Sequence, residues 1–181
     1  MSEYIEDCNN PVYQVFNEFS SFINSIIIFH FFSDKMIKNI ALDAMRVYIR
    51  ALVEFFEKKD NAQNESRNDN LFYSDFIDIE EDLSVKISQD VRQCINKETA
   101  HLSKKRGTLN FDNNKYNKAI KDVLYAIFKF MESCKTSLKS EYKNNYNDND
   151  VSMLIQDINN KVDIALKCII SMDESRGVIH N

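Results

Sequence analysis

The chain has 181 residues, a net charge of -5 and 44% hydrophobic residues, which predicts one domain with a hydrophobic core of its own. With only 2 Gly and 1 Pro, it lacks the turn residues that β-sandwiches, barrels and doubly wound sheets need. Because glycine stands only at positions 107 and 177, a Gly-rich phosphate-binding loop is excluded as well. The composition favours a few long helices.

The first two predicted helices form an antiparallel hairpin. Residues 1–10 are polar and are expected to be loose, and Pro11 stands where a helix can begin. Apolar residues at helical spacing predict a helix over about residues 12–32, and Asp34 can cap a second helix over about residues 35–59. Since one or two residues join the helices, an antiparallel hairpin is the simplest arrangement. The second helix is expected to turn one apolar stripe to the core: Ile37, Ile40, Ala41, Ala44, Met45, Tyr48, Ala51, Leu52, Phe55 and Phe56.

A long acidic loop then interrupts the helical pattern. Residues 61–70 are polar apart from Ala62 and are expected to form a solvated loop. Residues 71–79 are apolar and aromatic, and predict a lid segment or short helix that packs on the bundle. The acidic run at residues 78–82 favours a solvated or partner-facing patch over a metal site.

Three further helices are predicted over about residues 84–106, 112–142 and 151–172. Ser84 or Ser88 can cap the first of them, and residues 173–181 are expected to be a loose tail. The sequence therefore predicts a single all-α domain. Its expected architecture is a five-helix up-and-down bundle with the acidic loop between helices two and three.

The cysteines and the apolar runs indicate in which cellular compartment the protein is expected. No pair among Cys8, Cys94, Cys134 and Cys168 has metal-ligand spacing, and the last three fall in apolar stripes, so buried reduced thiols are expected. Together with the lack of a signal-peptide pattern, this predicts a cytoplasmic protein. The most apolar run, residues 22–32, contains polar residues and is too short to span a bilayer, so no membrane association is expected. No motif predicts a cofactor or a metal.

The first predicted helix is apolar around most of its surface near residues 22–32. A helix that is apolar all round is buried all round. In a bundle of this size it must be central or cover a partner, so a twofold homodimer is expected.

A histidine, an amide and a group of cations come together late in the third predicted helix. The candidate catalytic residues are His101 and Asn96, and the candidate RNA- or phosphate-binding residues are Arg92, Lys97, Lys104, Lys105 and Arg106. A histidine exchanges a proton near neutral pH, and neighbouring cations can offset the charge of a phosphorane. These residue types therefore suit metal-independent cleavage of a phosphodiester. Alternatively, basic residues gather there only because they favour a helix C-terminus.

The phrase "NKETAH" at residues 96–101 and the phrase "RALVEFF" at residues 50–56 resemble small uncharacterised bacterial proteins of the HEPN superfamily. Many members carry an arginine, four to six residues and then a histidine, which the active members use as a metal-independent endoribonuclease site across a dimer. His101 matches that histidine, whereas Asn96 stands where the arginine is expected. The resemblance implies an RNA-directed protein, such as the ribonuclease of a toxin or phage-defence system with a cognate protein partner.

A second hypothesis comes from a different class of protein, a non-catalytic helical module for dimerisation or partner binding. Asn96 in place of the arginine favours it, whereas the basic end of the third helix favours the RNA-directed hypothesis. The 13 Phe and 8 Tyr are expected on core stripes, rather than interleaved with basic residues on an open face that could stack bases.

Overall fold

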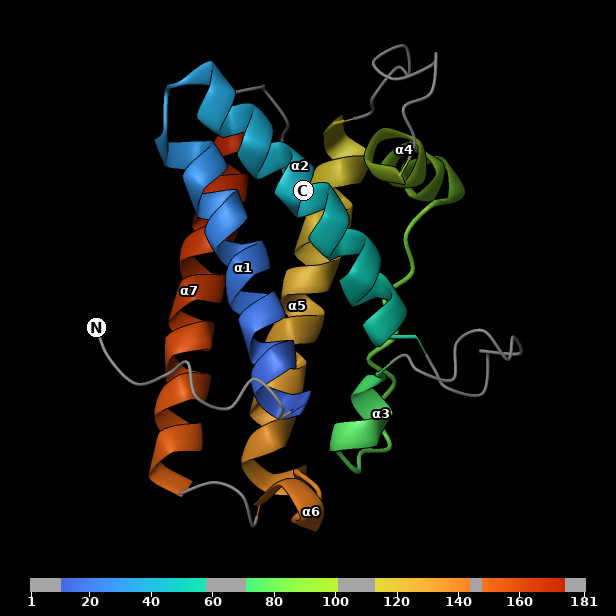
Figure 1. Cartoon of the computed structure of the whole chain (residues 1–181), viewed down its shortest axis with the longest axis vertical. Helices are drawn as coiled ribbons and strands as arrows, with labels where there is room; N and C mark the ends of the chain where they lie inside the picture. Colours follow the sequence, from blue (N-terminus) through green and yellow to red (C-terminus); the bar gives the residue numbers. More distant parts are fainter. Residues whose placement is uncertain (1–10, 58–70, 101–112, 144–147, 175–181) are drawn as a thin grey trace.

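The computed structural model describes residues 11–57, 71–100, 113–143 and 148–174, and most of these residues are helical (Figure 1). No strand occurs within these ranges, so the predicted all-α class is confirmed. The helices are α1 (Pro11–Phe31), α2 (Lys35–Phe55), α3 (Tyr73–Phe76), α4 (Gln89–Ala100), α5 (Asn113–Ser137), α6 (Ser140–Lys143) and α7 (Asp148–Glu174).

Four long helices, α1, α2, α5 and α7, form the body of the molecule in the described ranges. α1 packs against α2 and α7, and α5 packs against α7 and α2. α4 lies on α2 and α5, and Figure 1 shows it nearly end-on while α1, α5 and α7 run vertically. α4 therefore crosses the side of the bundle, whereas an up-and-down order of five helices would place it parallel to the others.

Aromatic rings from four helices meet at the centre of the core. Phe130 of α5 is 1% exposed. Its ring centroid lies 5.6 Å from that of Phe19 in α1, 5.5 Å from Phe55 in α2 and 6.4 Å from Phe76 in α3. Edge-to-face pairs of this kind are favourable beyond their buried area. One ring thus ties α5 to three other helices.

The predicted hairpin is present, but the predicted inward stripe of α2 is only partly buried. The Asp34 carboxylate accepts a hydrogen bond of 3.0 Å from the Ile37 amide, as a helix cap does. Ile37, Ile40 and Ala51 of the stripe are exposed. The apolar pattern of α2 is wider than the face that α1 and α5 can cover, so part of it remains at the surface.

The predicted lid over residues 71–79 packs on the bundle, as its apolar residues suggested. Phe72, Tyr73, Phe76 and Ile77 are buried, whereas Leu71 is exposed, contrary to expectation. The expected loop at residues 61–70 lies outside the described residues.

An isolated antiparallel bridge then joins Ile77 to Leu138. The Asp78 amide donates to the Ser137 carbonyl at 3.0 Å, and the Lys139 amide donates to the Phe76 carbonyl at 2.9 Å. These bonds take up backbone groups that a continuous helix would use itself. The helix predicted over residues 112–142 is therefore wrong at its end: α5 stops at Ser137 and α6 follows as a single turn.

Residues 84–88 were expected to begin the third helix, and that expectation is wrong. They belong to a non-helical segment, residues 78–88, which we call the connecting segment and which runs from α3 to α4 (Figure 1). Leu83 and Val85 are buried while Ser84 and Lys86 are more exposed, the alternation of an extended chain. The amide and hydroxyl of Ser84 donate to the Asp82 carboxylate, so Ser84 does not cap a helix. Ser88, the other candidate cap, precedes α4 directly.

The C-terminal helix is longer than predicted. α7 continues to Glu174, and Asp173, placed in the loose tail by the sequence, is only 3% exposed. Its carboxylate accepts hydrogen bonds from the Asn117 amide group and, at 2.8 Å, from Lys121 Nζ, both on α5. This contact between α5 and α7 holds the last turn in place. The expected loose residues 1–10 and 175–181 lie outside the described residues.

The described cysteines are buried as predicted. Cys94, Cys134 and Cys168 are buried and form no disulfide within the described part of the chain, and burial raises the pKa of the Cys134 thiol to about 12. Cys8 lies outside the described residues. Each helix in the described ranges is too short or too polar to cross a membrane.

Candidate functional sites

The structure describes the side chains of two of the predicted site residues. Arg92 and Asn96 lie one turn apart on α4. Lys97 also belongs to α4. His101, Lys104, Lys105 and Arg106 lie outside the described residues.

Arg92 and Asn96 line one small hollow, of about 30 Å³, where α4 faces α2. Its wall is completed by residues of α2, the connecting segment and α4: Arg50, Val53, Glu54, Ile87 and Ile95. Arg50 is the residue that the sequence missed, although it opens the phrase at residues 50–56. Its only signal was its position off the apolar stripe of α2, and nothing in the sequence places it beside Arg92.

Carboxylates compensate both arginines of the hollow. Arg92 Nη2 lies 3.0 Å from Glu57 Oε1, and Arg50 Nε lies 3.6 Å from Glu54 Oε1. An anion that enters the hollow would have to displace these carboxylates from the guanidinium groups. Among the described residues that line it there is no histidine, so the described part of the hollow suits binding through guanidinium and amide groups.

Contacts with both neighbouring helices, α2 and α5, hold α4 in place. Val91, Cys94 and Ile95 are buried. In its first turn Asp90 Oδ2 lies 2.6 Å from Lys115 Nζ of α5, and the hydrogen bond from Lys115 holds the pKa of the Asp90 carboxyl well below its usual range. The position of Arg92 and Asn96 is therefore set by packing on α2 and α5.

The acidic run at residues 78–82 faces cations and a hydroxyl. Asp78 Oδ1 lies 3.7 Å from Lys139 Nζ, and Glu81 Oε1 lies 3.5 Å from Lys129 Nζ. The Asp82 carboxylate accepts from Ser84, as described above. Across the described ranges, no group of three or more His, Cys, Asp or Glu side chains is placed to hold a metal ion.

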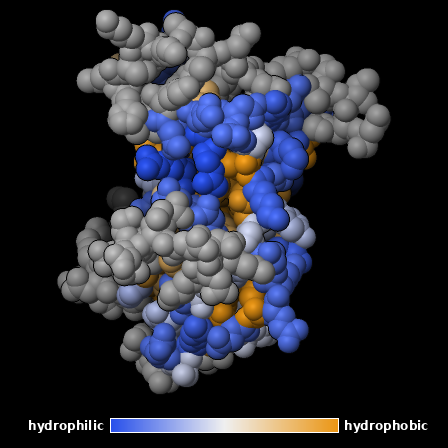
Figure 2. Space-filling model, turned by 90° about the vertical axis from the view of Figure 1, so that its right-hand side faces the viewer, coloured by the Kyte–Doolittle hydropathy of each residue, from blue (hydrophilic) through white to orange (hydrophobic). Residues whose placement is uncertain are grey.

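A larger groove of about 420 Å³ runs between the connecting segment and α5. Residues 81–86 line one wall, and α5 supplies the other with Lys118, Asp122, Tyr125, Ala126 and Lys129. Figure 2 shows the side of the molecule that carries α3 and α4, where a strip of apolar atoms lies between hydrophilic flanks.

Tyr125 is the unexpected residue of this groove. It is 60% exposed, and Lys129 Nζ lies 5.7 Å from the centroid of its ring. The expectation that the aromatic residues lie on core stripes is therefore wrong for Tyr125, and also for Phe31 and Phe32. The spacing of Lys118, Tyr125 and Lys129 by seven and four residues, which puts them on one helix face, was the signal available in the sequence.

A third surface feature lies at the turn between α1 and α2, and we call it the apolar end. Phe31 is 67% exposed and Met36 is 71% exposed. The apolar end consists of six large hydrophobic residues from the last turn of α1, the turn itself and the start of α2: Ile28, Phe31, Phe32, Met36, Ile37 and Ile40.

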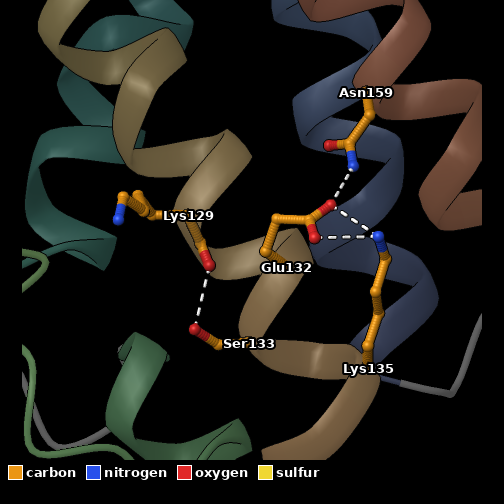
Figure 3. Close-up of polar contacts among 5 residues, drawn as sticks. All are labelled: Lys129, Glu132, Ser133, Lys135 and Asn159. Carbon is orange, nitrogen blue, oxygen red and sulfur yellow. Dashed lines mark hydrogen bonds and ion pairs between the residues drawn. The ribbon is translucent and has the colours of Figure 1, made fainter.

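A polar contact farther along α5 has a structural role. Asn159 of α7 donates to Glu132 Oε1 at 2.7 Å, and Lys135 Nζ lies 2.6 Å from the same oxygen (Figure 3). The Ser133 hydroxyl donates to the Lys129 carbonyl at 2.9 Å. The Asn159 bond joins α7 to α5, whereas the other two contacts lie within α5, so we do not count this group as a site.

No protein-family model matches the chain, and neither a curated protein nor a solved structure matches it. The three candidate sites, which are the hollow, the groove and the apolar end, are therefore defined by the geometry of this chain's own residues.

Proposed function

We propose that the protein is a helical interaction module that forms a twofold homodimer through the apolar end. The observation that carries this proposal is the exposure of six large hydrophobic side chains at the end of α1, in the turn and at the start of α2. Soluble monomers rarely leave contiguous apolar patches of more than a few hundred Å² in water, and larger patches mark interaction sites.

The size of the apolar end suits a dimer interface. Six such side chains, each about half exposed, present on the order of 600 Å² of surface, against about 800 Å² per partner in a stable interface. The polar residues at the edge of the apolar end supply the remaining area of the interface. A second copy of the chain is the occupant because one surface can meet itself across a twofold axis.

Charges at the edge of the apolar end are compatible with that symmetry. Asp34 and Lys35 are adjacent, exposed and opposite in sign. Across a twofold axis, the aspartate of one copy can face the lysine of the other, and the reverse pair follows automatically. Such pairs favour one register of the two apolar surfaces.

Sedimentation equilibrium tests this proposal. The wild-type protein should sediment as a dimer at micromolar concentration, and a Phe31→Asp, Met36→Asp variant should sediment as a monomer with an unchanged helical circular dichroism spectrum. The matched control is Met153→Asp, which replaces an exposed methionine at the start of α7, at the opposite end of the molecule (Figure 1). A wild-type monomer at about 100 µM, well above the Kd of an ordinary stable dimer, would contradict the proposal.

An RNA-directed function of the HEPN kind is the second candidate. Its support is that Arg92 and Asn96, singled out by the sequence, line one hollow with a further arginine, Arg50. It predicts that the purified protein cleaves single-stranded RNA without a metal, and that His101→Ala abolishes cleavage without unfolding the protein. Asn96→Arg, which restores the arginine of the resemblance, should raise the rate. If wild type and Asn96→Arg both leave labelled RNA uncut and unbound, this candidate is ruled out.

A further inference from the structure

The connecting segment presents backbone groups that the described part of the protein does not use. Within the described ranges, Leu83, Val85, Lys86 and Ile87 form no backbone hydrogen bond with another element. Their side chains alternate between the core and the surface, as in a strand at the edge of a sheet. An extended edge with unpaired N–H and C=O groups is a template for another strand.

The groove beside this edge has room for a peptide. Its volume between residues 81–86 and α5 is about 420 Å³. On its α5 wall, the exposed ring of Tyr125 lies next to Ala126 and offers an apolar contact. A peptide strand that lies along the connecting segment would place alternate side chains against that wall.

The charges of the groove indicate the chemistry of the occupant. Lys118 is paired with Asp122 at 2.7 Å and Lys129 with Glu81 at 3.5 Å. Lys86 is exposed and has no carboxylate partner among the described residues, so it is the cation available to a ligand. Carboxylates line the same groove as the lysines, which disfavours a polyphosphate backbone and leaves a polypeptide as the better fit.

We propose that this groove binds an extended peptide segment of a partner protein, which adds as a strand along residues 83–87. An acidic side chain of the peptide faces Lys86, and an apolar or aromatic side chain two residues away rests on Tyr125. Main-chain hydrogen bonds supply the affinity, and the alternate side chains supply the selectivity. The groove and the apolar end share no residue, so this binding does not depend on dimerisation.

A peptide array provides the probe for this proposal. Fluorescein-labelled eight-residue peptides with one Glu, with Val, Ile, Phe or Tyr two residues away from it and with Ser or Thr at the other positions, are titrated against the full chain by fluorescence anisotropy. A subset should bind, and Lys86→Glu should weaken these peptides roughly tenfold while favouring their lysine counterparts. Tyr125→Ala should weaken them as well. Lys167→Glu, the same charge change at an exposed position of α7, should leave binding unchanged.

Backbone pairing and location are tested separately. N-methylation of alternate peptide residues should abolish binding, and the amide resonances of residues 83–87 should shift when the unmodified peptide is added. The same titration with Phe31→Asp, Met36→Asp should give the same affinity, which separates this proposal from the dimer. Three outcomes would overturn it: no array peptide binds, binding is insensitive to both Lys86→Glu and N-methylation, or oligouridylate binds the groove in preference to every peptide.

Discussion

Asp173 is a single residue whose importance depends on its partners in α5. Its side chain is buried, with the Asn117 amide group and the Lys121 ammonium as hydrogen-bond donors. A buried carboxylate is costly unless it is paired and hydrogen-bonded, and here both conditions are met. Removing the carboxylate therefore leaves a buried amide group and a partly buried cation without their acceptor.

Asp173→Ala should lower the free energy of unfolding by about 3 kcal/mol, the usual cost of breaking a buried pair. The matched control is Asp157→Ala in the same helix, whose partner Lys161 lies at 2.5 Å in an exposed pair one turn away. That change should cost about 0.5 kcal/mol or less. Urea unfolding followed by circular dichroism measures both, and equal losses for the two variants would refute the role given to Asp173.

Asp90 provides a prediction about pH. Because the hydrogen bond from Lys115 lowers the pKa of the folded Asp90 carboxyl, the pair stabilises the fold above the usual pKa of aspartate, and this contribution is lost as the pH falls through the folded value. Lys115→Met should move the titration midpoint of Asp90 upward, as measured from its carboxyl carbon shift by NMR. Lys118→Met, which removes a cation paired instead with Asp122, should leave that midpoint in place.

Burial should protect the described cysteines from alkylation. Since burial raises the pKa of Cys134 to about 12, almost none of this thiol is ionised at pH 8. Iodoacetamide added to the folded protein at pH 8 should leave Cys134 unmodified, whereas in 8 M urea it should react completely. Peptide mass spectrometry reads out the site, and rapid labelling of Cys134 in the folded protein would show that α5 opens readily.

At the scale of the element, the long helices could be predicted and the connecting segment could not. α1, α2, α5 and α7 each repeat apolar residues over five turns or more, so their period is clear. Residues 83–88 alternate apolar and polar residues, as a strand does, but this run is short and leads directly into a helical pattern, so helix and strand compete. Tertiary packing decides between them, because Leu83 and Val85 can both enter the core only if the chain is extended.

Substitutions along the connecting segment should therefore lower the free energy of unfolding with a period of two residues. Leu83→Asp and Val85→Asp each place a charge in the core and should cost about 3 kcal/mol or more. Ser84→Thr, which keeps the hydroxyl beside the Asp82 carboxylate, and Lys86→Asp, at the surface, should cost about 0.5 kcal/mol or less. Thermal unfolding of the four variants checks the pattern, and costs that followed a helical period would contradict the extended conformation.

In the hollow and the groove, the sequence predicted only those neighbours that lie on the same helix. Arg92 and Asn96 share a face of α4 because helical spacing puts them there. Arg50 reaches the same hollow from α2, and Tyr125 and Lys86 meet at the groove from separate elements. These proximities arise from how helices cross, which the pattern of one segment does not contain.

At the scale of the whole molecule, Phe130 joins α5 to α1, α2 and α3 in one core. Phe130→Ala should cost about 3–5 kcal/mol, since four surrounding rings cannot collapse into the space that it leaves. Met153→Ala, at an exposed position of α7, should cost about 0.5 kcal/mol or less. Guanidinium unfolding at equilibrium compares the two, and a small loss for Phe130→Ala would mean that the helices are held together elsewhere.

The packing of α1 on α7 has a consequence for synthesis on the ribosome. α1 is made before α7, on which it packs, and more than a hundred residues separate the two helices. At 5–20 residues per second, translation takes roughly 6–25 s to pass from the end of α1 to the start of α7. During that interval the face of α1 that packs on α7 has an incomplete cover. A nascent chain stalled before α7 should therefore bind a general chaperone that the complete chain no longer binds.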